Sequence, residues 1–184
     1  MAYKRKKEKI FPFHSVLRWL MDIVVVIGAA IFVGIYLGSR YTVTGYSMEP
    51  VLTHADKVLI DKLCYHFREP ERGDIILFQP KADEETYYMK RIAALPGETV
   101  QIRNGVLYID GVSCEGDADT EKILNAGLAE QALTLGTEEY FVLGDNYNSS
   151  EDSRFASIGN IRRSSIVGRA WLLVTTVDDV SLVE

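Results

Sequence analysis

The sequence predicts a mainly β fold, in which an antiparallel β-sheet domain is attached to one N-terminal transmembrane helix. An apolar segment, Trp19–Leu37, lies near the N-terminus. The chain after it consists of short runs of β-branched and aromatic residues separated by turn-forming residues, which is typical of antiparallel sheets. The 184 residues, 47% of them hydrophobic, suffice for one domain of ordinary size and an anchor.

The apolar segment is long enough to cross a membrane. Asp22 is its only charged residue and lies near its start, where the side chain reaches the membrane interface. As a helix the segment would span roughly 28 Å, close to the thickness of the hydrocarbon core of a bilayer. A cleaved leader would have a shorter apolar core and a small-residue cleavage motif. We therefore expect a transmembrane helix, with a buried helix of a soluble protein as the alternative.

The distribution of charge predicts how this helix is oriented. Residues 1–18 contain six basic residues against Glu8, although the net charge of the whole chain is −6. Because positively charged flanks stay in the cytoplasm, we expect a cytoplasmic leader (1–18), a single transmembrane helix in the cell membrane (19–37) and an extracytoplasmic β-rich domain (38–184). The acidic balance of that domain argues against nucleic-acid binding.

The outer domain is expected to contain eight strands. Asn104-Gly105 predicts a hairpin turn between two of them, because both residues tolerate positive φ angles. Residues 119–133 have apolar residues at helical spacing and predict one short amphipathic helix, although Gly127 weakens it. The expected strands are Tyr41–Tyr46, Lys57–Leu63, Asp74–Phe78, Tyr87–Ile92, Thr99–Arg103, Val106–Ile109, Tyr140–Leu143 and Ser165–Thr175.

The two cysteines and three histidines give no sign of a metal site. No Cys/His cluster has the spacing of metal ligands, so we expect no metal and no cofactor. Cys64 and Cys114 lie on the oxidising side of the expected membrane, and the sequence leaves open whether they form a disulfide.

Ser47 lies in the turn-like stretch GYSMEP and is a candidate nucleophile. A serine hydroxyl needs a base that accepts its proton. His14 belongs to the leader on the other side of the expected membrane, which leaves His54, His66 and the lysines. Lys90, in YYMKRIAALPGE, lies on an expected strand whose apolar neighbours could bury it, and burial lowers the pKa of a lysine. Composition and periodicity alone do not choose among these bases.

A third polar segment, GDNYNSSEDSR at Gly144–Arg154, follows a strand-like apolar run. It suits a structured loop, and it lacks the pattern of a calcium-binding loop. Together with the anchor, GYSMEP, RGDIILF at 72–78 and YMKRIAALPGE at 88–98, it resembles the type I signal peptidase family of membrane-bound serine proteases. The order and short spacers resemble the compact Gram-positive enzymes of that family.

The resemblance implies a Ser/Lys dyad. Ser47 matches the nucleophile, Lys90 the general base, and Ser150 the residue whose hydroxyl orients the lysine. The charged positions that maintain the shape of the site are matched by Asp145, Asp152 and Arg154, the last two as an ion pair.

The resemblance also implies an oxyanion site and substrate pockets. The Ser47 N–H is one oxyanion donor. Gly45 stands where Gram-negative members have a second hydroxyl, so the second donor is left open. Small residues at the first and third positions before the cut would be recognised, with the substrate added as an extended strand beside 43–46 and 87–89. The implied pocket residues are Val43, Gly45, Met48, Leu52, Tyr88 and Met89.

The predicted function is therefore a membrane-anchored serine endopeptidase that removes N-terminal signal peptides from exported preproteins at the outer face of the membrane. Expected partners are preproteins, the lipid bilayer, and components of a secretion translocon or pilus assembly system. Alternatives are a peptidase dedicated to pilins or another narrow client, and an assembly factor of the same fold that does not cleave. A cytosolic self-cleaving Ser/Lys repressor is disfavoured by the anchor and the acidic charge. The sequence leaves the clients and the oligomeric state open.

Overall fold

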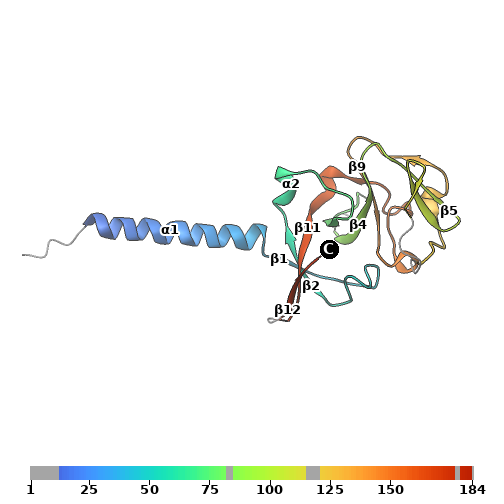
Figure 1. The fold of residues 1–184 in the computed structure, drawn as a ribbon. Coiled ribbons are helices and arrows are strands. Elements are labelled where there is room, and N and C mark those ends of the chain that lie inside the picture. The colour runs from blue at the N-terminus through green and yellow to red at the C-terminus, as the bar shows by residue number, and fades with distance from the viewer. Residues whose placement is uncertain (1–12, 82–84, 115–120, 177–178, 184) are drawn as a thin grey trace, which may run out of the picture.

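The computed structural model describes residues 13–81, 85–114, 121–176 and 179–183. One long helix, α1, projects from a β-rich domain that contains two sheets (Figure 1). All strand pairs in both sheets are antiparallel, so the predicted fold class is confirmed.

The predicted N-terminal helix is present and begins earlier than the sequence indicated. α1 spans Phe13–Tyr36. Its segment Ser15–Tyr36 is the one helix in the described part of the chain that is long and apolar enough to cross a membrane, and its apolar window is not buried against the rest of the protein. Residues 1–12 of the predicted leader lie outside the described residues.

The larger sheet carries most of the outer domain. Its strands lie in the order β1-β2-β11-β3-β4-β9-β10, and β12 also pairs with β11. A short helix, α2 (Cys64–Phe67), and a one-turn helix, η3 (Arg163–Ser165), lie in its connections. The strands span Ser39–Thr42 (β1), Lys57–Asp61 (β2), Ile75–Phe78 (β3), Tyr88–Ala94 (β4), Glu139–Leu143 (β9), Ile161–Arg162 (β10), Ile166–Thr176 (β11) and Asp179–Leu182 (β12).

The smaller sheet lies at the end of the domain remote from α1 (Figure 1). Its order is β7-β6-β5-β8. The predicted hairpin is confirmed, because Asn104 and Gly105 have φ angles of 53° and 81° and connect β5 to β6 with the predicted bounds. These strands span Thr99–Arg103 (β5), Val106–Ile109 (β6), Val112–Ser113 (β7) and Leu133–Thr134 (β8).

The helix predicted over 119–133 is wrong. Residues 121–133, the part within the described residues, contain only a one-turn 3₁₀ helix, η1 (Gly127–Glu130). Gly127 has a φ angle of +53°, and a Cβ there would lie 2.2 Å from the Arg154 carbonyl oxygen. The segment is irregular, and of its apolar residues Ile123 is buried in the core cluster of the smaller sheet whereas Leu124 and Leu128 are exposed. Tertiary packing therefore overrides the periodicity.

Strand β1 ends earlier than predicted, at Thr42 rather than Tyr46. The Val43 N–H donates to the Asp56 carbonyl (2.8 Å), and the Ala55 N–H donates to the Val43 carbonyl (2.9 Å). Gly45 follows at a φ angle of +88°, which L-residues rarely adopt. The chain thus leaves the sheet just before Ser47 and forms a loop.

Both cysteines are free thiols. Cys64 is half-buried at the start of α2, whereas Cys114 is exposed just after β7. The disulfide that the sequence left open is therefore not formed.

Candidate active site

Ser47 lies in the loop between β1 and β2, and apolar packing holds that loop in place. Met48 and Leu52 are almost completely buried, and the Leu52 N–H donates to the Met48 carbonyl (2.9 Å). Both side chains pack in a core cluster beneath the larger sheet. Ser47 is thereby presented from a turn whose neighbouring residues are part of the core.

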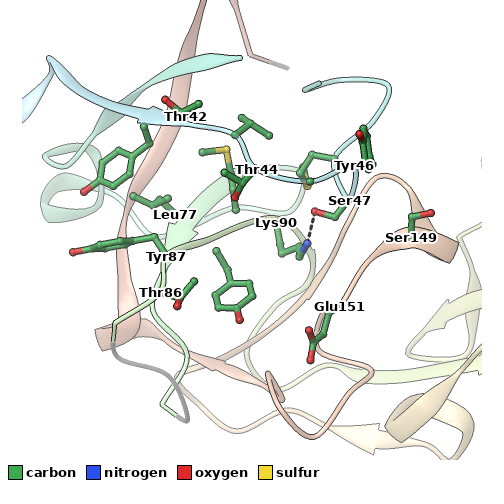
Figure 2. A pocket seen from close by; sticks show the side chains of 16 residues that line it. Thr42, Thr44, Tyr46, Ser47, Leu77, Thr86, Tyr87, Lys90, Ser149 and Glu151 are labelled. Carbon is green, nitrogen blue, oxygen red and sulfur yellow. Dashed lines mark hydrogen bonds between the residues drawn. The ribbon is translucent and has the colours of Figure 1, made fainter. Parts of the chain in front are cut away.

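Lys90 approaches Ser47 from the middle of β4. Alternate residues of this strand, Lys90, Ile92 and Ala94, are buried, so the lysine side chain lies on an apolar face as the strand period requires. Only 4% of Lys90 is exposed. Its Nζ forms a 2.5 Å hydrogen bond with Ser47 Oγ (Figure 2).

The environment of Lys90 favours its neutral form. Burial lowers the pKa of the Lys90 ammonium from 10.5 to about 8. The carboxylates of Asp152, Glu151 and Asp145 act in the opposite direction, and the Arg154 cation supports the lowering. Desolvation is the dominant cause, because it disfavours charge directly whereas the carboxylates only partly offset it.

The two histidine candidates for the base are placed elsewhere. His54 Nδ1 accepts a hydrogen bond from the Gly45 N–H (3.1 Å), and its ring faces the ring of Tyr46. His66 belongs to α2 and is exposed. Of the candidate bases, Lys90 is therefore the one in contact with Ser47 Oγ.

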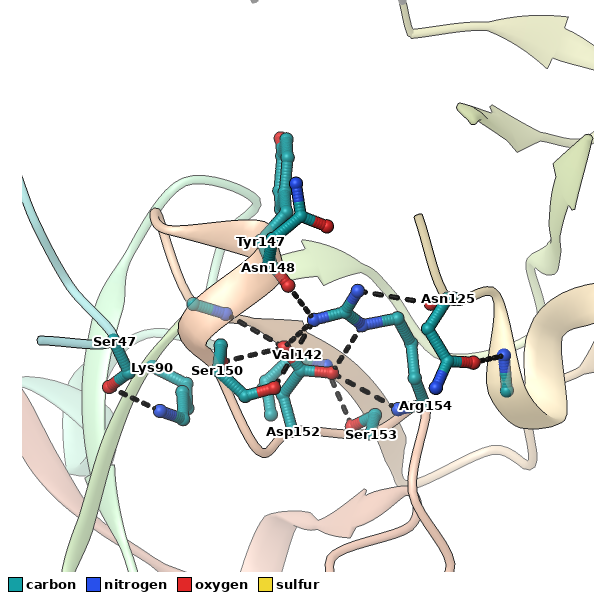
Figure 3. A network of polar contacts seen from close by, with 12 residues as sticks. Ser47, Lys90, Asn125, Val142, Tyr147, Asn148, Ser150, Asp152, Ser153 and Arg154 are labelled. Carbon is teal, nitrogen blue, oxygen red and sulfur yellow. Dashed lines mark hydrogen bonds and ion pairs between the residues drawn. The ribbon is translucent and has the colours of Figure 1, made fainter. Parts of the chain in front are cut away.

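Behind the dyad, Asp152 is the centre of a buried polar network (Figure 3). Arg154 donates from Nε to Oδ1 and from Nη2 to Oδ2 of Asp152, both at 2.8 Å. The Ser150 hydroxyl donates to Oδ2 (2.7 Å), and so does the Gly144 N–H (3.2 Å). Asp152 and Arg154 are at most 1% exposed, so the ion pair implied by the family resemblance is present and fully dehydrated.

Arg154 also connects this network to the rest of the chain. Its guanidinium donates to the carbonyl oxygens of Asn125 (3.1 Å) and Tyr147 (2.5 Å). The planar fork of an arginine can satisfy several acceptors at once. Arg154 therefore ties the segment after Ser150 to the irregular segment that contains Gly127.

Ser150 is brought close to the dyad, but its hydroxyl donates to Asp152 and not to Lys90. Among the described residues, the one hydrogen bond of Lys90 Nζ is to Ser47. That Ser150 orients the lysine directly stays a prediction. The contact with Asp152 indicates an indirect contribution, because it holds the carboxylate whose charge acts on Lys90.

Asp145 forms a second ion pair, with Arg91. The guanidinium donates from Nε to Oδ1 (2.7 Å) and from Nη2 to Oδ2 (2.8 Å), and Nη1 donates to the Gly73 carbonyl (2.8 Å). Sequence reasoning missed Arg91. Its position directly after Lys90, on the opposite face of the strand, was the available signal. The pair connects the strand that carries Lys90 to the loop that begins at Gly144.

Gly144 is a further residue that sequence reasoning missed. A Cβ at this position would lie 2.3 Å from Ser150 Oγ and 2.3 Å from the Ser47 carbonyl oxygen. The Asn146 N–H donates to the same Ser47 carbonyl (3.1 Å). The loop after β9 thus packs its backbone directly against Ser47.

A cleft of about 250 Å³ opens beside the dyad. Ser47 and Lys90 line it together with five of the six residues implied as substrate-binding, which are Val43, Gly45, Met48, Tyr88 and Met89. Leu52 lies outside the lining, fully buried in the core behind Met48. Within the described residues no group of His, Cys, Asp and Glu is arranged to hold a metal ion.

The oxyanion donors are only partly accounted for by the described contacts. The Ser47 N–H makes no hydrogen bond with the described residues. The Gly45 N–H is occupied by His54. A second donor is not identified.

Comparison with known proteins identifies the family. The family described as "Signal peptidase, peptidase S26" matches residues 16–175. Signal peptidase I P of Bacillus subtilis subsp. natto is 33% identical over 156 residues, covering 80% of this chain and 83% of that protein. Signal peptidase I of Bacillus amyloliquefaciens is 31% identical over 172 residues, covering 90% and 91%.

Among solved structures, the crystal structure of a signal peptidase I from Enterococcus faecalis is 37% identical, with a TM-score of 0.45. The match covers 55% of this chain and 97% of the Enterococcus faecalis chain. Because the family match extends from the N-terminal helix through most of the outer domain, the chain belongs to the signal peptidase family, peptidase S26.

Proposed function

We propose that this signal peptidase is a Ser/Lys-dyad endopeptidase that removes N-terminal signal peptides from exported preproteins after small residues of the Ala-x-Ala type. The observation that carries the proposal is the 2.5 Å contact between Lys90 Nζ and Ser47 Oγ, made by a lysine that is 4% exposed. A buried lysine beside a serine hydroxyl is a base that needs no histidine.

The lowered pKa makes the base accessible at neutral pH. A lysine with a pKa of about 8 is neutral in about one molecule in ten at pH 7, at a cost of roughly 1.4 kcal/mol. An unperturbed lysine would require roughly 5 kcal/mol. Burial therefore removes most of the barrier to forming the base.

The mechanism follows from these positions. Neutral Lys90 accepts the Ser47 proton while Oγ attacks the carbonyl carbon of the scissile peptide bond. The resulting ammonium then donates that proton to the leaving amine as the C–N bond breaks, which leaves an acyl-enzyme. Lys90, neutral again, deprotonates the water that hydrolyses the ester. The Ser47 N–H supplies one donor to the oxyanion.

The cleft supports recognition of an extended chain with small side chains. β9 pairs with one edge of β4, and only from Arg91 onward. On that same edge, Met89 and Lys90 have no strand neighbour in the described part of the chain. A peptide can add there as a strand. The volume of about 250 Å³ is at the lower limit of typical ligand pockets, which favours small residues next to the scissile bond.

Membrane anchoring by α1 completes the proposal. The basic leader would stay in the cytoplasm and the β-rich domain would face outward, where signal peptides emerge. The bilayer is then a partner, together with the preproteins. A translocon or pilus component stays a prediction from sequence, and the intact dyad argues against an assembly factor that does not cleave.

The test uses the full chain in detergent and a preprotein whose leader ends in Ala-x-Ala. Wild type is expected to cut after the second alanine, as N-terminal sequencing of the product would show. Ser47→Ala removes the nucleophile and is expected to be inactive, and Lys90→Ala is expected to lose at least about 100-fold in kcat/KM, the usual contribution of a general base.

The matched control is Lys57→Ala, at an exposed lysine at the start of β2, which is expected to retain activity. Cleavage by Lys90→Ala at the wild-type rate would exclude the dyad and return His54 and His66 as candidate bases. Loss of activity in the control would show that the assay reports on folding and not on the base.

A further inference from the structure

Glu151 lies at the active-site cleft, and the mechanism gives its side chain no proton-transfer or binding step. It lies between Ser150 and Asp152, whose buried side chains enter the network around Arg154. The backbone at Ser150 is extended (φ −120°, ψ 132°), so the next side chain points to the opposite side. Glu151 is accordingly exposed and lines the cleft (Figure 2).

The carboxylate of Glu151 acts electrostatically on Lys90 and raises the pKa of the lysine, but no cation is in direct contact with it among the described residues. The other carboxylates beside the dyad are paired, Asp145 with Arg91 and Asp152 with Arg154. Glu151 forms no ion pair with any described residue. Its Oε1 accepts a hydrogen bond from the Ser157 hydroxyl (2.6 Å). Glu151 therefore adds to the cleft lining a carboxylate that is not held in a contact ion pair.

The position of Glu151 along the cleft indicates which part of a substrate it meets. In Figure 2 the dyad lies between Thr86 and Tyr87 on one side and Ser149 and Glu151 on the other. The signal peptide is expected beside β4 and the loop before Ser47, on the Tyr87 side. The chain after the scissile bond then leaves past Ser149 and Glu151.

We propose that Glu151 forms an acidic subsite for the residue that follows the cleavage site, so that a basic residue there is favoured over a neutral one and an acidic residue is disfavoured. This inference rests on the proposed function, because it assigns the two ends of the cleft to the two sides of the cut. An opposite charge in an exposed site contributes a fraction of a kcal/mol up to about 1 kcal/mol. A preference of roughly two- to five-fold per charge is therefore expected.

The experiment compares three Ala-x-Ala peptides that differ only in the residue after the cut, which is lysine, glutamine or glutamate. The full chain in neutral detergent is assayed at about 20 mM salt, where screening is weak. Wild type is expected to show kcat/KM in the order lysine, glutamine, glutamate. Glu151→Gln is expected to bring the three values together, and Glu151→Lys to reverse the order.

The matched control is Glu130→Gln. Glu130 is exposed on η1 and engages the rest of the protein through its backbone carbonyl, which accepts from Gln101 Nε2. It is expected to keep the wild-type order. About 0.5 M salt is expected to compress the order in wild type, because a Debye length of roughly 4 Å screens an exposed pair.

The readout separates a subsite from a structural role. If Glu151 only holds Ser157, then Glu151→Gln slows all three peptides equally, and that outcome overturns the proposal. Two other outcomes would also overturn the proposal: a wild type that cleaves the three peptides with equal kcat/KM, and a Glu151→Gln variant that keeps the wild-type order.

Binding separates this proposal from the proposed function. Dissociation constants of the three peptides are measured with Ser47→Ala and with Ser47→Ala/Glu151→Gln, in which no cleavage occurs. Ser47→Ala is expected to bind the lysine peptide most tightly and the glutamate peptide least tightly, whereas Ser47→Ala/Glu151→Gln is expected to bind the three peptides equally. Absence of cleavage by wild type would contradict the proposed function, whereas equal dissociation constants in Ser47→Ala would contradict the subsite.

Discussion

At the scale of single residues, the chemistry depends on the burial of one lysine. Lys90 is an ordinary residue by composition, and its pKa of about 8 arises because β4 places it on an apolar face. The nearby carboxylate of Asp152 raises that pKa but is itself held by Arg154. The ion pair between Asp152 and Arg154 therefore limits how far the Asp152 carboxylate can stabilise the Lys90 ammonium.

The lowered pKa of Lys90 predicts the pH dependence of catalysis. Lys90 must be neutral to accept the Ser47 proton, and below a pKa of about 8 the neutral fraction falls tenfold per pH unit. We expect kcat/KM to rise about tenfold per unit from pH 5 and to level off near pH 8. A pH–rate profile measures this, and a profile that is flat down to pH 5 would contradict Lys90 as the base.

Gly144 is a second residue whose importance is local and steric. Gly144→Ala would place a Cβ 2.3 Å from both the Ser47 carbonyl oxygen and Ser150 Oγ. Overpacking of this kind costs typically 1–3 kcal/mol, and here the displaced atoms belong to the site. We expect kcat/KM to fall at least about tenfold, with a smaller relative effect on thermal stability.

Gly136→Ala is the control for Gly144→Ala. Its Cβ would meet only the side chain of Glu139, at 3.2 Å, and that side chain can move. We expect near-wild-type activity. If Gly144→Ala were as active as this control, the close contact with the nucleophile would have no catalytic role.

At the scale of elements, three chain segments far apart in the sequence converge on the site. The loop after β1 provides Ser47, β4 provides Lys90, and the segment after β9 provides Asp152. The ion pair of Asp145 with Arg91 holds the last segment to β4, and the hydrogen bond from Arg154 to the Asn125 carbonyl holds it to the irregular segment. The geometry of the dyad therefore depends on contacts between elements and not on either element alone.

The buried ion pair should contribute strongly to stability. Asp152→Asn would leave the 1%-exposed Arg154 guanidinium without a counter-charge, which costs about 3–5 kcal/mol in the free energy of unfolding. Thermal or urea unfolding of the detergent-solubilised chain measures this. Glu69 forms an exposed ion pair with Arg163, and its own side chain is 80% exposed. Glu69→Gln should therefore lower the free energy of unfolding by no more than about 1 kcal/mol. Equal effects of the two substitutions would show that burial does not set the cost.

At the scale of the whole molecule, the N-terminal helix is joined to the β-rich domain without a flexible linker. Only Leu37 and Gly38 separate α1 from β1. The carbonyl at the end of α1, that of Tyr36, accepts from the Lys62 N–H (3.0 Å), and that of Leu37 accepts from Trp171 Nε1 (3.4 Å). These bonds satisfy carbonyl groups that a helix end leaves open, and they connect the end of α1 to the sheet.

A rigid connection predicts that a spacer will uncouple the site from the membrane. Inserting about six Gly/Ser residues after Leu37 should lower the cleavage rate of a membrane-inserted preprotein in proteoliposomes, because the cleft is no longer held at one height and orientation. Cleavage of a soluble peptide by the same protein should change less than two-fold. Equal effects on both substrates would contradict the role of the connection.

The sequence by itself determined the features that depend on neighbouring residues along the chain. The length and apolarity of 19–37 predicted α1, and the positive φ angles that Asn104-Gly105 tolerate predicted the hairpin between β5 and β6. The motif order predicts the family by resemblance, and that resemblance implies Ser47 and Lys90 as a pair, whose side chains are in contact in the structure. Local conformational preference and motif spacing suffice for these inferences.

Tertiary structure decided what depends on contacts across the chain. The periodicity over 119–133 indicated a helix, but Gly127 packs against Arg154 at a positive φ angle and the segment stays irregular. The roles of Arg91 and Gly144, and the place of Glu151 in the cleft, appear only when β4 and the loop after β9 are side by side. The pKa of Lys90 belongs to the same class, because desolvation is a property of the surrounding fold and not of the residue.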